Sequence, residues 1–70
     1  MKSKIVIYHL LPHLRGWCLY KQGASRLTKI VSTRRKGEKI GLSLIKKYSI
    51  GKLYIHDGDG KLIDVVNYEK

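Results

Sequence analysis

One stretch of this chain, from Thr33 to Tyr48, repeats its apolar residues at helical spacing, and this stretch most constrains the fold. Ser32 and Thr33 offer a hydroxyl N-cap, and Gly51 is expected to end the helix. The stripe contains two glycines, which cost about 1 kcal/mol each in helix propensity but let the helix axis approach a neighbour closely. We therefore expect one helix that packs on a sheet. The stripe consists of Gly37, Ile40, Gly41, Leu44, Ile45 and Tyr48.

The segments on both sides of this helix are rich in β-branched and aromatic residues, which is typical of strands. We expect strands over residues 4–10, 17–21, 27–31, 52–56 and 61–66, with the first strand ending before Pro12. The residues from Asp57 to Gly60, Asp-Gly-Asp-Gly, predict a hairpin turn between the last two strands. The order β-β-β-α-β-β predicts a single α+β domain over residues 1–70, with one helix packed on one face of a small antiparallel sheet.

Length, charge and cysteine content narrow the class of protein. The 70 residues carry 15 Lys and Arg against 5 Asp and Glu, a formal net charge of +10, and 43% of them are hydrophobic. This composition predicts a globular domain despite the charge. Cys18 is the single cysteine, which excludes an intramolecular disulfide and a cysteine-rich zinc site and fits a cytoplasmic location. No segment approaches the roughly 18 apolar residues of a membrane span, so we expect no membrane association.

The cationic side chains of the predicted helix fall away from its apolar stripe and form a basic ridge. A solvated helix face is the ordinary explanation for such a pattern. Three of these cations, however, occupy the first turn, where the helix dipole is positive and free backbone N–H groups lie. Such a cluster favours an anion, and phosphate is the anion we expect. The ridge consists of Arg35, Lys36, Lys39, Lys46 and Lys47, and Arg34 joins Arg35 and Lys36 in the first-turn cluster.

The strands predict a second candidate surface on the sheet face away from the helix. We expect Ile5, Ile7, Trp17, Leu19, Leu53 and Ile55 to face the helix, and the period of two then places another set on the opposite face. Tyrosines mixed with lysines are typical of platforms that stack unpaired bases, and Tyr20 and Tyr54 are the candidate stacking residues. A partly buried second layer or a homodimer interface is the alternative. The opposite set is Lys4, Tyr8, Tyr20, Lys52, Tyr54 and His56.

Other residues give weaker indications of chemistry. The turn from Asp57 to Gly60 resembles the start of a calcium loop but lacks the downstream liganding Glu, so a plain turn is expected. The histidines His9, His13 and His56 have no spacing that indicates a metal site. Cys18 has no partner that would make it a nucleophile, and five carboxylates offer little for paired acid–base chemistry. We expect a protein that is not an enzyme and has no cofactor or metal.

The order of several short motifs resembles a known family. The motifs are His9, Pro12, Gly16-Trp17, Gly23-Ala24-Ser25-Arg26, Thr33 before the helix, His56, Asp59-Gly60-Lys61-Leu62 and Tyr68. Together they resemble the small prokaryotic family called domain of unknown function 2188, over about residues 8 to 68. The resemblance implies a compact α+β fold with one helix and implies no activity. The helix of that family is commonly rich in Ala and Glu, whereas this helix is basic.

The expected function is that of a small nucleic-acid-binding protein that contacts the phosphate backbone with low sequence specificity. The alternative is a protein-interaction module, such as a mobile-element accessory factor that docks its basic face on an acidic host protein. Adsorption to anionic lipid is less favoured because the apolar stripe of the helix is already committed to the sheet.

Overall fold

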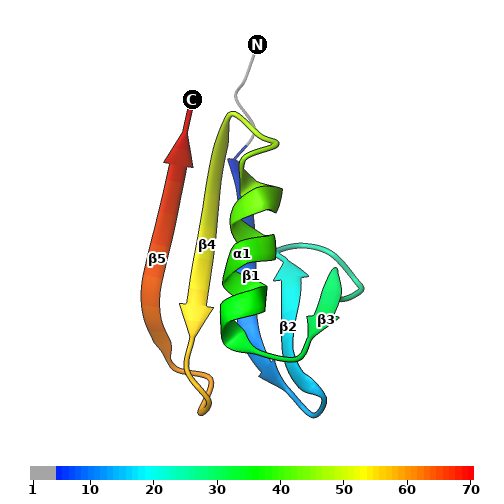
Figure 1. Cartoon of the computed structure of the whole chain (residues 1–70). Helices are drawn as coiled ribbons and strands as arrows, with labels where there is room; N and C mark the ends of the chain where they lie inside the picture. The colour runs from blue at the N-terminus through cyan, green and yellow to red at the C-terminus, as the bar shows by residue number, and fades with distance from the viewer. Residues whose placement is uncertain (1–4) are drawn as a thin grey trace.

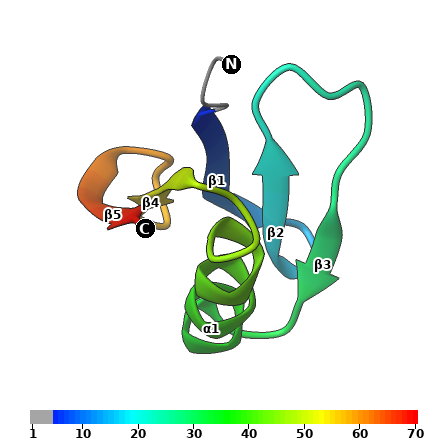
Figure 2. The same cartoon turned by 90° about the horizontal axis from the view of Figure 1, so that it is seen from above.

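A computed structural model describes residues 5–70 as one sheet with a single helix against it. The elements are β1 (Ile5–His13), β2 (Gly16–Lys21), β3 (Lys29–Val31), α1 (Arg34–Ile45), β4 (Ile50–His56) and β5 (Leu62–Glu69). The strands lie in the order β3-β2-β1-β4-β5, and α1 covers one face while the other face carries no helix (Figures 1 and 2). The predicted α+β class and the order β-β-β-α-β-β are confirmed.

The sheet is mixed, whereas the sequence predicted antiparallel strands throughout. β1 pairs parallel to β4, with Ile5 opposite Ile50 and Leu10 opposite Ile55, and the other three strand pairs are antiparallel. The chain leaves β3 at one edge, crosses the sheet through α1 and enters β4 on the far side of β1. A crossover of this kind is what joins parallel neighbours, so the helix and the parallel pair arise together.

The core lies between α1 and the central strands. Leu10, Leu19 and Ile45 are completely buried, and Leu53 is nearly so. Leu19, Leu53 and Ile55 face the helix as predicted, and Trp17 packs partly buried against the same cluster. These contacts fix α1 over β1, β2 and β4 and leave β5 largely uncovered on the helix side (Figure 1).

The predicted orientation of β1 is wrong. Tyr8 is 5% exposed and belongs to the core beneath α1, together with Val6, while Ile5 is 57% exposed. Val6, Tyr8 and Leu10 share the side of β1 that faces the helix, and period two then turns Ile5, Ile7 and His9 to the open face. Burial also raises the pKa of Tyr8, and the neighbouring Tyr48 adds to the rise. Lys4, which was also predicted for the open face, lies outside the described residues.

The helical stripe packs as its glycines predicted. Gly37, Gly41 and Ile45 are buried, and Ile40, Leu44 and Tyr48 pack partly buried against the core. A Cβ at Gly41 would lie 2.9 Å from both Leu53 methyl carbons and 3.2 Å from Leu19 Cδ2, so only glycine leaves room for this approach. Thr33 caps the helix, because its Oγ1 accepts from the Lys36 N–H at 3.2 Å.

Several element boundaries differ from the prediction. α1 ends at Ile45 and not near Gly51, which lies inside β4, and β2 and β4 each begin one or two residues earlier than expected. β1 continues through Pro12 to His13, since its pairing with β4 ends at Leu10 and Pro12 has a neighbour only on the β2 side. β3 begins at Lys29 and not at residue 27, and β5 extends to Glu69. Gly16 opens β2 with φ +128°, where a Cβ would lie 2.6 Å from the Val31 carbonyl oxygen. Across residues 5–70, no helix is long and apolar enough to cross a membrane.

Candidate nucleic-acid interface

The cations of the basic ridge are exposed along α1, and Arg35 and Lys39 also line the groove beside the helix. Arg34, Arg35, Lys36 and Lys39 are exposed on the helix, and Lys46 and Lys47 are exposed just after it. One of these cations is partly neutralised, because Arg34 Nε lies 3.4 Å from Glu38 Oε2, one helical turn away. That pair is the single ion pair within the described part of the chain. Among residues 5–70, the five ridge cations therefore have no carboxylate partner and are exposed to solvent.

The first turn of α1 holds cations and contains no acidic residue. The Lys36 N–H is bound by Thr33 Oγ1, and the Gly37 N–H by the Thr33 carbonyl oxygen at 3.1 Å. The N–H groups of Arg34 and Arg35 precede the first intrahelical bond. The positive end of the helix dipole thus coincides with Arg35 and Lys36, a local arrangement that favours an anion.

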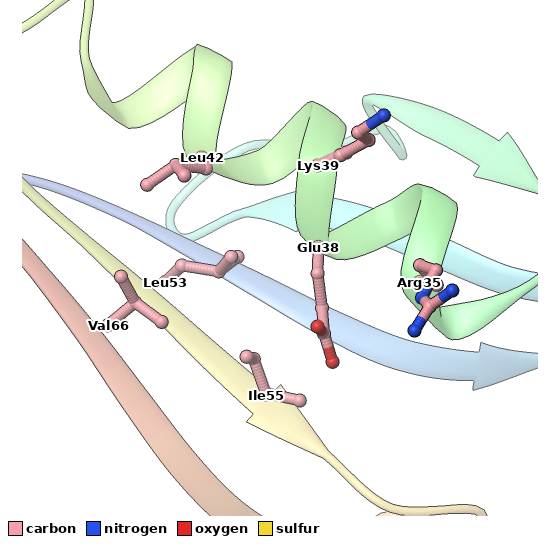
Figure 3. Close-up of a pocket in the computed structure, with 7 residues that line it drawn as sticks. All are labelled: Arg35, Glu38, Lys39, Leu42, Leu53, Ile55 and Val66. Carbon is pink, nitrogen blue, oxygen red and sulfur yellow. The ribbon is translucent and has the colours of Figure 1, made fainter.

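A groove of about 270 Å³ runs beside α1 on the helix side of the sheet. Leu42, Leu53, Ile55 and Val66 give it apolar walls and floor, and Arg35, Glu38 and Lys39 line it from the helix. Figure 3 shows Glu38 reaching over Ile55, while Lys39 points away from the sheet. The groove exists because α1 leaves β5 uncovered.

Charge is segregated along the chain and therefore across the sheet. Residues 1–49 hold 12 of the 15 bases and a single acid, Glu38, a formal charge of +11. Residues 50–70, which form β4 and β5, hold three bases and four acids, a formal charge of −1. Positive charge is thus concentrated in the part of the chain that forms α1, β2 and β3, and not in the β4–β5 hairpin.

The open face carries a row of side chains across three strands, with His9 between two tyrosines. His9 of β1 is paired with Tyr20 of β2 and with Tyr54 of β4. The ring centroids of His9 and Tyr54 are 5.1 Å apart in an edge-on arrangement, and those of His9 and Tyr20 are 6.4 Å apart. The structure thus places Tyr20 and Tyr54 on one face with a third ring between them. Lys52 and His56 of β4 lie on the same face.

Hydrogen bonds hold these rings in place. His9 Nε2 lies 3.0 Å from Gln22 Oε1, and His9 Nδ1 lies 3.3 Å from His56 Nε2. His56 Nδ1 donates to the Gly60 carbonyl oxygen at 3.1 Å, since a carbonyl only accepts. The Tyr20 hydroxyl donates to the Ala24 carbonyl oxygen at 2.8 Å. These bonds tie the β2–β3 loop, which projects to the side away from α1 (Figure 2), and the β4–β5 turn to the same ring cluster.

Sequence reasoning missed His9 and Gln22 as members of this surface. The contact between His9 and His56 joins positions 47 residues apart and requires the parallel pairing of β1 with β4. The sequence feature that could have indicated His9 is the alternation of side chains along β1. If Tyr8 is buried beneath the helix, the next residue, His9, lies on the open face.

The comparison with protein-family models decides the family. The model described as "Uncharacterized protein conserved in bacteria (DUF2188)" matches residues 8–68 of this 70-residue chain. The chain is a DUF2188 protein. Comparisons with curated proteins and with solved structures found no match.

Several residues that carried the resemblance meet in the structure of this DUF2188 protein. His9 and His56 form the ring contact on the open face, and Gly60 supplies the carbonyl that His56 binds. Gly23, next to Gln22, has φ +90°, and Gly60 has φ +82°, a backbone region that favours glycine. Some family motifs therefore build turns and rings of the open face, whereas Trp17 and Tyr68 pack against the core and Thr33 caps α1.

The remaining candidate groups of the DUF2188 chain belong neither to the ring cluster nor to the basic ridge. Asp57 Oδ1 accepts hydrogen bonds from the N–H groups of Asp59 and Lys61, each at 2.9 Å, so this carboxylate stabilises the backbone of its own turn. His13 accepts from the Arg15 N–H at 3.1 Å and is not part of the ring cluster. Cys18 is buried, which raises the pKa of its thiol. Within residues 5–70, no three His, Cys, Asp or Glu side chains converge as metal ligands would.

Proposed function

We propose that this DUF2188 protein is a small basic nucleic-acid-binding protein that contacts the phosphate backbone with low sequence specificity. The observation that carries the proposal is the segregated charge: residues 1–49 have a formal charge of +11, and five exposed ridge cations have no carboxylate partner. Exposed cations at a helix N-terminus suit phosphate oxygens. The ridge offers no defined set of amide side chains for reading base edges, which is why we expect low specificity.

The open face adds a second element to the proposal. His9, Tyr20 and Tyr54 present ring faces and edges that unpaired bases can stack on, and Lys52 lies on the same side of the sheet. In this proposal α1 binds the backbone of a duplex, and the open face adds affinity for single strands. A cytoplasmic location, with access to DNA and RNA, belongs to the same proposal.

The test is the salt dependence of binding to a short duplex DNA. Five ridge cations predict a slope of log K against log salt of roughly −4 to −5. Lys36→Gln with Lys39→Gln should reduce this slope by about 2, because two phosphate contacts are lost. Lys61→Gln, compared with Lys36→Gln alone, is the matched control, since it removes the same charge from the β4–β5 turn, outside both proposed surfaces, and should leave the slope nearly unchanged.

Two outcomes would contradict the proposal. Equal losses from Lys36→Gln and Lys61→Gln would show that net charge alone, and not the ridge, drives the attraction. No binding at about 50 mM salt would favour the alternative of an acidic protein partner, because weak screening should reveal even non-specific nucleic-acid binding. A pull-down from cells, with and without nuclease, separates those partners directly.

A further inference from the structure

The strand β5 presents a long free edge of the sheet. It spans eight residues at one end of the order β3-β2-β1-β4-β5, whereas β3 at the other end spans three (Figure 1). Leu62 is 45% exposed, Ile63 49% and Val65 36%. An exposed edge of this length and composition is a template for pairing with another strand.

The backbone groups available at this edge follow from the ladder with β4. The Lys70 N–H donates to the Ser49 carbonyl oxygen at 3.0 Å, so Lys70 points its backbone toward β4. Antiparallel strands alternate the direction of their backbone groups, and Val65, Asn67 and Glu69 therefore point theirs outward. Consistent with this direction, the Val65 N–H is bound not by β4 but by Asp64 Oδ1, at 2.8 Å.

Electrostatics restrict where two copies of so basic a chain can meet. Residues 1–49 have a formal charge of +11 and repel their counterparts, whereas residues 50–70 have a formal charge of −1. β5 lies in the second group. It is therefore an edge that two copies can bring together without strong mutual repulsion.

We propose that a second copy of this chain pairs antiparallel with β5, over residues 64–70 and about a two-fold axis at Asn67. In this register the outward groups of Val65, Asn67 and Glu69 meet their counterparts, and the Val65 N–H exchanges its bond to Asp64 Oδ1 for a ladder bond to the partner copy. Asp64 of each copy lies opposite Lys70 of the other, and Val66 lies opposite Tyr68. Both are favourable cross-strand pairs, and each occurs twice.

Other registers fit less well. Centring the axis on Val65 would run the ladder through the irregularity that the β4–β5 pairing shows next to Ile55 and His56. Centring it on Val66 would place Asp64 opposite Tyr68 and leave Lys70 without a charge partner. The Asn67 register alone combines the regular part of β5 with opposite charges at both ends.

The dimer has a consequence for the two surfaces already described. A two-fold axis in an antiparallel ladder stands perpendicular to the sheet, so both copies of α1 lie on the same face. Tyr68 of the second copy comes next to Val66, which forms part of the floor of the groove beside α1. The paired molecule thus presents two basic ridges on one side and two ring clusters on the other.

Sedimentation equilibrium without nucleic acid tests this pairing independently of the proposed function. We expect a concentration-dependent particle of twice the 8.1 kDa chain mass. Asp64→Lys alone and Lys70→Asp alone each bring like charges together twice and should weaken the dimer by about tenfold or more. The double variant D64K/K70D restores opposite charges and should restore the dimer. Asp59→Lys, the same charge change in the exposed turn, is the control and should leave association unchanged.

A backbone variant provides a second measurement. Asn67→Pro removes an N–H group that points outward, so it should abolish the dimer while the ladder with β4 and the circular dichroism spectrum persist. A monomer at all concentrations would overturn the proposal, as would a dimer that survives Asn67→Pro or that the double charge variant fails to rescue. A dimer that forms only after Asp64→Ala would also overturn the proposal, because Asp64 would then prevent strand pairing at β5 in the native chain.

Discussion

Replacing Gly37 by alanine sets two opposing energies against each other. Alanine is favoured over glycine in a helix by about 1 kcal/mol. At this position, however, a Cβ would overlap Leu10 Cδ1 and lie 3.3 Å from Leu10 Cδ2 and Val31 Cγ2. Leu10 is fully buried and Val31 is 7% exposed, so neither side chain has space to retreat into. Overpacking of a buried contact costs about 1–3 kcal/mol, and the close approach of α1 should place Gly37 toward the upper end.

We therefore expect Gly37→Ala to lower the free energy of unfolding by about 1–2 kcal/mol, despite its better helix propensity. For a domain of this size the melting temperature should fall by about 5–15 °C. Thermal and urea unfolding followed by circular dichroism measure both quantities. Gly58→Ala is the control: a Cβ there meets nothing within 4 Å, so stability should stay the same or rise slightly. A Gly37→Ala variant as stable as the wild type would refute the close contact between α1 and β1.

Three further predictions concern the helix end, the open face and pH. Arg35→Gln with Lys36→Gln should leave the melting temperature equal or slightly higher, because cations at the positive end of the helix are unfavourable, and should lower the affinity for duplex DNA. A clearly lower melting temperature of the double variant would show that these residues have a structural role instead. Tyr54→Ala should weaken binding of a single-stranded oligonucleotide by about 1–3 kcal/mol in a fluorescence titration and leave duplex binding nearly intact, whereas equal losses would argue against stacking. Because burial raises the pKa of Tyr8, the folded chain holds the hydroxyl proton more tightly than the unfolded chain, so the free energy of unfolding should fall above about pH 10. Tyr8→Phe should reduce this fall in urea unfolding experiments from about pH 8 to 11. An unchanged fall in the variant would show that other groups cause it.

The sequence was sufficient for the parts of the fold that depend on local pattern. The stripe from Gly37 to Tyr48, the Thr33 cap and the turn from Asp57 to Gly60 are each specified by a few neighbouring residues. The family motifs could also be recognised in the sequence, and the family-model match over residues 8–68 confirms the family assignment. Local spacing and capping chemistry leave little choice in such segments.

What the sequence did not predict depends on which strands become neighbours. The first strand contains Ile5, Ile7 and Tyr8, apolar or aromatic side chains of both parities, so period two did not decide which of them faced the helix. Parallel pairing of β1 with β4 could not be read from either segment, because it is a property of the crossover through α1. The ring contact between His9 and His56 depends on both of these choices, and for that reason it was missed.

The central parallel pair also shapes how this chain folds. β1 lies in the middle of the sheet, and its partner β4 begins 45 residues later, with Ile5 opposite Ile50. The hairpins β1–β2 and β4–β5 need only short loops and can form early, but neither buries the core alone. The sheet closes only when α1 has carried the chain across. Bringing β1 and β4 together loses chain entropy before the contacts between them stabilise the sheet. We therefore expect a high folding barrier and slow folding for a domain this small. During synthesis, residues as far as Ile55 must emerge before β1 can complete its pairing with its central neighbour.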